Sequence, residues 1–151
     1  MRIFIDGDSC SIIQTTETIA KQYDIECHIY CDTKRILESD YSKVHIVDYG
    51  PDAVDFAIIK ECGEGDIVIT NDTELASIAL VRHSIVINSK GIRFTRENLT
   101  PFLAGRYLRY KEARRTGKKQ VKKSSMKGYV VHESYYKTLS TIIRAQKGKK
   151  R

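Results

Sequence analysis

Ile3-Phe4-Ile5-Asp6-Gly7-Asp8 is a short apolar run that ends in two carboxylates. An apolar run of this kind is typical of a buried strand. The two acids that follow cannot both be buried without partners, because an unpaired buried charge is costly. Acids at the carboxyl end of a strand in an open α/β sheet lie where ligands usually bind. The stretch therefore predicts a metal or phosphate site.

Strand-like and helix-like segments alternate over the first 90 residues, which predicts βαβ units and a parallel sheet. We expect strands at 2–5, 25–30, 43–47, 67–70 and 85–88. We expect helices at 9–21, 52–62 and 72–81, and a short helical turn at 33–38. The fold class is therefore α/β, with three layers (α/β/α) around a central, mainly parallel sheet of about five strands.

After Gly91 the alternation stops. The sequence predicts one continuous or broken helix at 95–115, a mobile basic loop at 116–128, a final helix at 133–146 and a basic tail at 147–151. We expect a single domain over residues 1–146, made of an acidic βα core (1–91) and a basic helical part (92–146).

The charge is distributed unevenly along the chain. Residues 1–91 carry 8 Lys and Arg against 16 Asp and Glu, whereas residues 92–151 carry 18 against 3. An acidic site beside a basic surface is the simplest interpretation, and nucleic acid is the natural partner of such a surface. No apolar run approaches the ~18–20 residues that span a bilayer, and the first residues do not resemble a signal peptide. We therefore expect a cytoplasmic protein without a membrane partner.

The cysteines and histidines show no metal-binding spacing. Cys27 and Cys31 flank a predicted strand, too far apart for a disulfide, and we expect the four cysteines to be buried free thiols. We interpret the histidines as isolated core or surface residues, because no pair has the spacing of zinc ligands; they are His28, His45, His83 and His132.

Further acids fall where later strands meet helices. Asp48 follows the third predicted strand, and Asp52 and Asp55 lie in the helix after it. Asp72 follows the fourth strand, next to Thr70, whose hydroxyl is suited to orient a metal-bound water. The carboxyl ends of parallel strands share one edge, so we expect a cluster there. The predicted metal ligands are Asp6, Asp8, Asp52, Asp55 and Asp72, and the predicted catalytic residues are Asp6, Asp8, Asp55, Thr70 and Asp72.

Carboxylates that lie close together repel one another unless a cation separates them, and hard oxygen ligands favour Mg²⁺ or Mn²⁺. Simpler interpretations remain open. Asp52 and Asp72 are suited to cap the helices that they precede, and so are Asp6 and Asp8 for the first helix. Asp48 is best explained as a solvated turn residue. Asp55 is harder to explain in this way, because its neighbours are mostly apolar.

The basic half interleaves cations with tyrosines. Arg and Lys neutralise phosphates, and Tyr rings stack on bases, although a solvated helix face has the same composition. Lys90, in the turn Asn88-Ser89-Lys90-Gly91, is expected at the same edge as the acids. The predicted nucleic-acid-binding residues are Lys90, Arg106, Arg109, Tyr110, Arg114, Arg115, Lys118 and Lys119.

Four segments resemble the YaiI/YqxD family of uncharacterised bacterial proteins, which is usually grouped with PIN/NYN-like nuclease folds. The family's Asp-Ala-Asp-Ala-Cys-Pro is similar to residues 6–11, and its Gly-x-Asp-x-Ala-Asp segment to residues 50–55. Its Gly-Asp-hydrophobic-Val-Ile-Thr-x-Asp is similar to residues 65–72, and its Asn-Pro-Arg-Gly to residues 88–91. The resemblance covers about residues 1–146. Ser11 and Ser89-Lys90 depart from it, but every candidate ligand is retained.

The resemblance implies a PIN-like, Rossmann-like topology and a metal-dependent nuclease that acts on RNA through Mg²⁺ or Mn²⁺. Two alternatives stay open. One is a nucleic-acid-binding protein without catalysis. The other is a phosphatase of the haloacid dehalogenase type, which also begins with a strand and Asp-x-Asp, but the usual Thr and the downstream Lys and Asp pair are missing here. The sequence does not determine whether the chain forms a homodimer.

Overall fold

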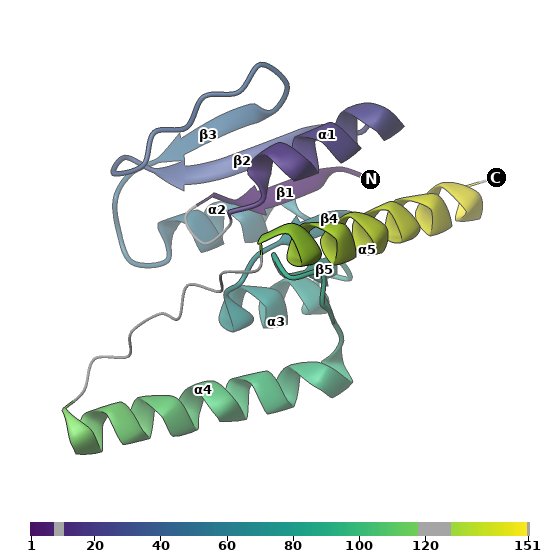
Figure 1. Ribbon diagram of the computed structural model, residues 1–151. Helices are drawn as coiled ribbons and strands as arrows, with labels where there is room; N and C mark the ends of the chain where they lie inside the picture. Colours follow the sequence, from purple (N-terminus) through teal and green to yellow (C-terminus); the bar gives the residue numbers. More distant parts are fainter. Residues whose placement is uncertain (8–10, 118–127, 151) are drawn as a thin grey trace.

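The computed structural model describes residues 1–7, 11–117 and 128–150, without the side chains of Arg106, Tyr110 and residues 129–132 (Figure 1). Predictions that concern Asp8, Cys10, Lys118, Lys119 and most of the basic loop lie outside these residues. The strands are β1 (Ile3–Asp6), β2 (Cys27–Asp32), β3 (Lys43–Val47), β4 (Ile67–Ile69), β5 (Ile85–Ile87) and β6 (Arg93–Phe94). The helices are α1 (Ile13–Tyr23), α2 (Ala53–Glu61), α3 (Thr73–Val81), α4 (Arg96–Thr116) and α5 (Gly128–Lys149).

The strands form one sheet in the order β3-β2-β1-β4-β5-β6, and all neighbours are parallel except β5 and β6. The chain places β2 and β3 on one side of β1 and the later strands on the other. The winding direction therefore reverses between β1 and β4, and in open α/β sheets the crevice at this reversal is the usual ligand site.

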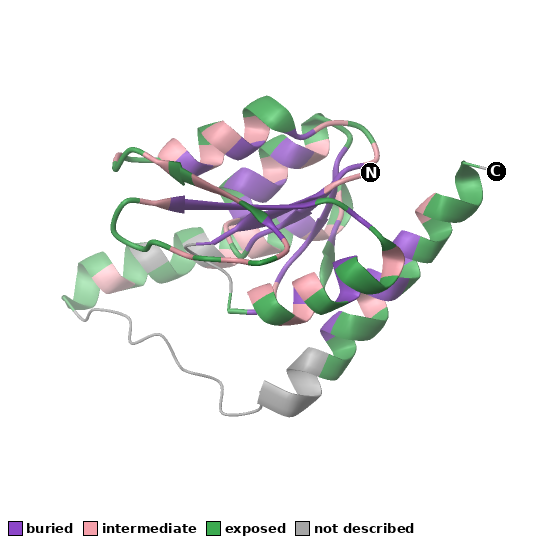
Figure 2. Cartoon of the chain, turned by 90° about the horizontal axis from the view of Figure 1, so that it is seen from above, coloured by how far each residue is buried: buried purple, intermediate pink, exposed green. Residues whose placement is uncertain are grey.

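Helices cover both faces of the sheet, so the molecule has the three layers that the sequence predicts (Figure 1). Ile3 and Ile5 of β1 pack on the face that α1 and α5 cover, whereas Phe4 packs on the face of α2, α3 and the start of α4. Because both faces are buried, the central strands are apolar at nearly every position. The buried residues accordingly concentrate in the strands and on the inner sides of the helices (Figure 2).

The two C-terminal helices attach to opposite faces of the sheet. The first turns of α4 pack through Leu99 and Phe102, whose ring meets Phe94 edge to face at 5.2 Å between centroids. Further along α4, Tyr107 and Leu108 are each 63% exposed, because this part of the helix extends away from the sheet (Figure 1). On the other face α5 packs against α1. No helix in the described part of the chain is long and apolar enough to span a bilayer.

Several predicted boundaries were wrong. Residues 33–34 form a turn and residues 36–38 have no regular structure, so the predicted helical turn was wrong. The Asp32 side chain accepts a hydrogen bond from the Lys34 N–H (2.8 Å) and favours an Asx-turn. Strand β2 continues to Asp32, and α1 begins only at Ile13. Strand β6 was not predicted, since two residues carry no periodicity. Helix α5 begins at Gly128 and continues to Lys149, so most of the predicted basic tail is helical.

The interpretation of the histidines as isolated residues was wrong for one pair. His28 Nδ1 and His45 Nε2 lie 2.8 Å apart, because β2 and β3 are neighbours in the sheet. The His28 ring stacks on Phe4 and the His45 ring on Tyr30. The two histidines are 17 residues apart in the sequence, so their spacing along the chain does not show that they lie on neighbouring strands.

The interpretation of the cysteines as buried free thiols is confirmed for Cys27, Cys31 and Cys62. Burial raises the pKa of the Cys27 thiol to about 12, so this residue stays in its unreactive, neutral form.

Candidate functional site

Asp6 and Thr70 meet at the point where the winding of the sheet reverses. Asp6 is the last residue of β1, and Thr70 follows β4, the strand that pairs with β1. Asp6 is 4% exposed, and its Oδ2 accepts a hydrogen bond from Thr70 Oγ1 at 2.9 Å. A buried carboxylate needs such a donor, so the bond holds the Asp6 side chain at the end of its strand.

The same hydroxyl connects β4 to the next helix. Thr70 Oγ1 accepts a hydrogen bond from the Asp72 N–H at 3.0 Å. Asp72 in turn is the N-cap of α3, and its Oδ1 accepts from the backbone of Glu74 (2.8 Å) and Leu75 (3.4 Å). The capping interpretation of Asp72 is therefore confirmed, and the Asp72 backbone N–H is linked to the Asp6 carboxylate through the Thr70 hydroxyl.

The pKa of the Asp55 carboxyl is raised by burial and by nearby acids. Asp55 lies half-buried in the first turn of α2. Burial, followed by the negative charges of Asp72, Asp6, Asp52 and Glu74, raises the pKa of its carboxyl from 3.8 to about 7. The structure thus brings Asp55 into the field of Asp6 and Asp72.

The remaining predicted acids behave differently. Asp52 occupies the N-cap position of α2 with φ of 58°, but its exposed side chain makes no capping hydrogen bond. Asp52 thus has the N-cap position that the sequence suggests, but its side chain does not cap the helix, because the left-handed backbone is not the extended one that N-caps use. Asp48 is exposed after β3, as expected of a turn residue.

The predicted metal ligands are all of one chemical kind. All candidate ligands are carboxylates, which is the ligand type of Mg²⁺ and Mn²⁺, and the raised pKa of Asp55 shows negative charge that such a cation would neutralise. Within residues 1–7, 11–117 and 128–150, no three His, Cys, Asp or Glu side chains form a group that could hold a metal ion. Asp8 lies outside these residues.

The turn between β5 and β6, which carries Lys90, is hydrogen-bonded to the segment that follows β4. Asn88 Oδ1 accepts from the N–H groups of Lys90 (3.0 Å) and Ile92 (2.9 Å), which closes the turn. The N–H and hydroxyl of Ser89 both donate to Asn71 Oδ1, at 3.0 and 2.8 Å. Asn71 lies between Thr70 and Asp72, so these bonds attach the turn to the edge of the sheet where Asp6 and Asp72 lie. Lys90, in the same turn, is exposed.

Comparisons with known proteins agree with the resemblance seen in the sequence. The model of the family described as "Uncharacterized BCR, YaiI/YqxD family" matches residues 4–145. The chain belongs to the YaiI/YqxD family. The UPF0178 protein of Clostridium kluyveri is 44% identical over 117 residues, which cover 78% of this chain and 76% of the relative. The UPF0178 protein of Clostridium acetobutylicum is 35% identical over 122 residues, 81% of this chain and 82% of the relative.

No solved structure matches this YaiI/YqxD chain. The assignment to PIN/NYN-like nuclease folds therefore stays a prediction, although the three-layer α/β/α architecture is confirmed.

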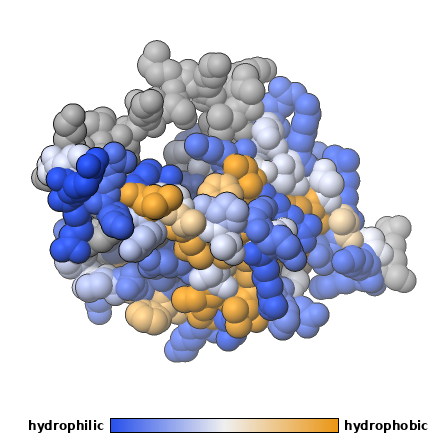
Figure 3. Space-filling model, turned by 90° about the horizontal axis from the view of Figure 1, so that it is seen from below, coloured by the Kyte–Doolittle hydropathy of each residue, from blue (hydrophilic) through white to orange (hydrophobic). Residues whose placement is uncertain are grey.

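Several of the predicted nucleic-acid-binding residues of this YaiI/YqxD protein lie on one exposed helix. Arg109, Arg114 and Arg115 are exposed in the second half of α4, and Arg115 lies 3.8 Å from Glu112. The last turn of α4 and the arrowheads of β2 and β3 point to the same side of the molecule (Figure 1). Seen from below, the surface is mostly hydrophilic, with hydrophobic residues in separate patches (Figure 3). The side chains of Arg106 and Tyr110 are outside the described set.

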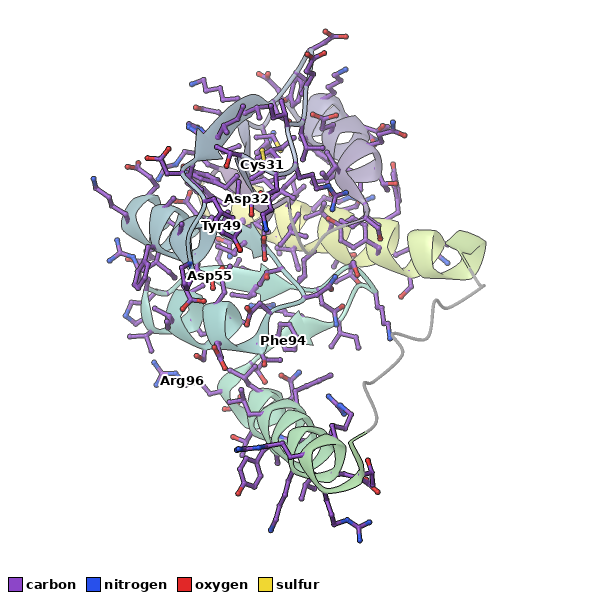
Figure 4. The ribbon with its side chains drawn as sticks, turned by 90° about the vertical axis from the view of Figure 1, so that its left-hand side faces the viewer. Cys31, Asp32, Tyr49, Asp55, Phe94 and Arg96 are labelled. Atoms are coloured by element: carbon purple, nitrogen blue, oxygen red, sulfur yellow. The ribbon has the colours of Figure 1, made fainter. Side chains whose placement is uncertain are left out.

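One acid of this edge was missed. Asp32 ends β2 on the same face as Tyr30, the residue that pairs with Asp6. Figure 4 looks onto the carboxyl ends of the strands and shows Asp32, Tyr49 and Asp55 in sequence along this edge. The apolar Cys31 after Tyr30 is a signal in the sequence that the strand continues. The predicted strand ended at Tyr30, two residues before Asp32.

Proposed function

We propose that this protein is a metal-dependent nuclease that hydrolyses phosphodiester bonds of RNA in the bacterial cytoplasm. The observation that carries the proposal is the convergence of Asp6, Thr70, Asp72 and Asp55 where the winding of the sheet reverses. Clefts at this place are the common ligand sites of open α/β sheets, and a carboxyl with a strongly perturbed pKa is a frequent mark of a functional site.

The cation is assigned by the chemistry of the acids. Asp6, Asp55 and Asp72, together with Asp8 and Asp52, would hold Mg²⁺ or Mn²⁺. When bound, such an ion activates a water molecule and stabilises the charge on a scissile phosphate.

The protein's own groups have separate roles in this proposal. The Thr70 hydroxyl orients the Asp6 carboxylate, to which it donates at 2.9 Å. Burial and the neighbouring acids raise the pKa of the Asp55 carboxyl to about 7, so a bound cation would stabilise its ionised form and bring it into use as a ligand. Lys90 lies at the same edge and is suited to bind a phosphate oxygen of the RNA.

The nucleic-acid-binding surface is the basic part of the chain. Exposed arginines along a helix neutralise successive phosphates without reading the bases. The proposed surface consists of Lys90, Arg106, Arg109, Tyr110, Arg114, Arg115, Lys118 and Lys119. The charge contrast between the halves of the chain supports this assignment, because the acids alone would repel RNA.

Cleavage of single-stranded RNA with Mg²⁺ or Mn²⁺ tests the proposal. We expect cleavage by the natural protein, and a loss of at least about a hundredfold in Asp6→Asn and Asp72→Asn, since removing an electrostatic stabiliser typically costs that much. Both amides retain an oxygen that accepts the hydrogen bonds of the folded state. Asp24→Asn is the matched control. Asp24 is the C-cap of α1, at the end of the helix opposite to the one that follows β1, and Asn also tolerates its φ of 52°. No cleavage, or cleavage unchanged in both site variants, would refute the proposal.

A nucleic-acid-binding protein without catalysis is the second candidate. It is favoured by the capping role of Asp72, whose Oδ1 is used by the backbone of α3. RNA binding that weakens steeply with salt, in a protein that cleaves no RNA under any metal condition, would identify this function.

A further inference from the structure

Tyr49 is a large aromatic residue that the structure leaves in solvent. It lies between β3 and α2, and its side chain is 64% exposed. Figure 4 shows it between Asp32 and Asp55, at the carboxyl edge of the sheet. Transfer of an aromatic ring out of water is favourable, so this exposed ring beside the candidate site is available for a ligand to cover.

A cation is already placed on this ring. Lys34 Nζ lies 4.0 Å from the centroid of Tyr49. The position of Lys34 is set by Asp32, whose side chain accepts from the Lys34 N–H at 2.8 Å and whose carbonyl accepts from the Arg35 N–H at 3.2 Å. Asp32 therefore acts here as the residue that shapes the turn. The result is an ammonium group and an aromatic ring held next to each other.

This pair matches the two parts of a nucleotide. An exposed ring is a platform for an unpaired base, and a lysine next to it neutralises the phosphate of that nucleotide. Duplex bases are already stacked on one another and cannot reach such a ring. Single-stranded nucleic acid is therefore the partner that uses both groups at once.

We propose that Tyr49 and Lys34 form a nucleotide subsite, in which one unpaired base takes the place of the Lys34 ammonium on the Tyr49 ring and the displaced ammonium binds the phosphate of that nucleotide. The inference rests on the proposed function, and it adds that the substrate is single-stranded at the nucleotide next to the acidic edge. Stacking does not depend on base identity, so the subsite selects strandedness and not sequence.

Binding without turnover tests the subsite separately from catalysis. Fluorescence anisotropy in EDTA would compare a short labelled oligoadenylate with an RNA duplex of the same length. We expect Tyr49→Ala to weaken binding of the single strand by about tenfold, since stacking of one base contributes about that much, and to leave duplex binding unchanged. Tyr49→Phe keeps the ring and should bind within about twofold of the natural protein. Val81→Ala removes a side chain that is 66% exposed at the far end of α3 and should have no effect.

A spectroscopic variant detects the stacking directly. The chain has no tryptophan, so Tyr49→Trp introduces a single indole. We expect oligoadenylate to quench its fluorescence, whereas an abasic strand of equal charge does not, and neither strand quenches Val81→Trp.

Three results would overturn the subsite. Equal binding of the single strand by Tyr49→Ala and the natural protein overturns the subsite and leaves the nuclease proposal standing. Preference for duplex overturns it as well. If the natural protein binds neither RNA, the subsite and the proposed function both fall.

Discussion

The hydrogen bond between Thr70 and Asp6 is the smallest unit of the candidate site. Asp6 is nearly inaccessible to water, so its carboxylate depends on protein donors, and the Thr70 hydroxyl is one of them at 2.9 Å. The same hydroxyl accepts from the Asp72 N–H. One side chain thus orders two acids that come from different strand–helix junctions.

Removal of this hydroxyl should destabilise the fold. Thr70→Val keeps the shape of the side chain but removes the donor to Asp6, and hydrogen bonds to charged groups contribute about 1.5–3 kcal/mol. We expect the free energy of unfolding in urea to fall by about that amount. Thr70→Ser retains the hydroxyl and should lose less than half as much. Equal losses in the two variants would show that the hydroxyl does not support Asp6.

Asp55 gives a pH-dependent prediction. Its folded-state pKa of about 7 exceeds the ordinary value of 3.8, because burial and the charges of Asp72, Asp6, Asp52 and Glu74 disfavour its ionised form. Its contribution to stability is therefore fully present below about pH 4 and is lost as the pH rises through 7.

Asp55→Asn removes this loss. In EDTA at pH 8 we expect the variant to be more stable than the natural protein by about 1–2 kcal/mol, a value reduced for the partial exposure of the side chain. The difference should shrink toward pH 4. Urea unfolding at several pH values measures it, and a difference that does not change with pH would contradict the raised pKa.

At the residue scale, the sequence was sufficient where an acid directly follows an apolar strand. Asp6 was placed at the end of its strand for this reason, Thr70 and Asp72 were placed at the end of the fourth strand, and the structure joins the three by hydrogen bonds. Tyr49 was not predicted, since nothing in its neighbours shows that Lys34 lies above its ring. Contacts between loops depend on tertiary packing and leave no local pattern.

Among the elements, long and periodic ones were predicted best. Strands buried on both faces read as apolar runs, and α3 shows its cap and its length in the sequence. The errors concern short elements, such as β6, and chain ends, such as the start of α5 at Gly128. Short elements are stabilised by their neighbours, so their own residues hold little information.

The turn before β6 depends on close contact with α5. Gly91 has φ of 81°, and a Cβ there would lie 2.9 Å from the Cα and N atoms of Tyr135. Gly65 has a similar φ of 77°, but a Cβ there would meet nothing within 4 Å. Substitutions at both positions would strain the backbone, but only a substitution at Gly91 would also cause a steric clash.

We expect Gly91→Ala to lower the free energy of unfolding by about 2–4 kcal/mol, and Gly65→Ala by about 1 kcal/mol, since only the first adds a clash to the strain. Urea unfolding of both variants provides the comparison. Equal losses would show that α5 does not pack against this turn as described. Because the turn carries Lys90, we also expect Gly91→Ala to weaken RNA binding.

At the scale of the whole molecule, the acidic and the basic residues that the sequence separates lie on different elements of the fold. The acids lie at the carboxyl edge of the sheet, and the exposed arginines lie on α4, which ends on the same side (Figure 1). The sequence predicted both groups but not their relative placement, because that depends on the direction in which α4 leaves the body of the protein.

Neutralising this helix should reduce the salt dependence of RNA binding. For single strands, each phosphate contact contributes about 0.7 to the slope of log K against log salt. We expect the slope to fall by about 2–3 when Gln replaces Arg109, Lys111, Arg114 and Arg115. Lys60→Gln, in the last turn of α2, is the control and should leave the slope unchanged. An unchanged slope in the fourfold variant would exclude α4 from the binding surface.

The central claim is that the acids at the carboxyl edge bind a divalent cation. A crystal soaked in Mn²⁺ and measured for anomalous scattering tests it most directly. We predict a peak in contact with the carboxylates of Asp6 and Asp72, and its loss in crystals of Asp6→Asn. A saturating soak that leaves this edge without a peak, or a peak that persists in Asp6→Asn, would contradict the account.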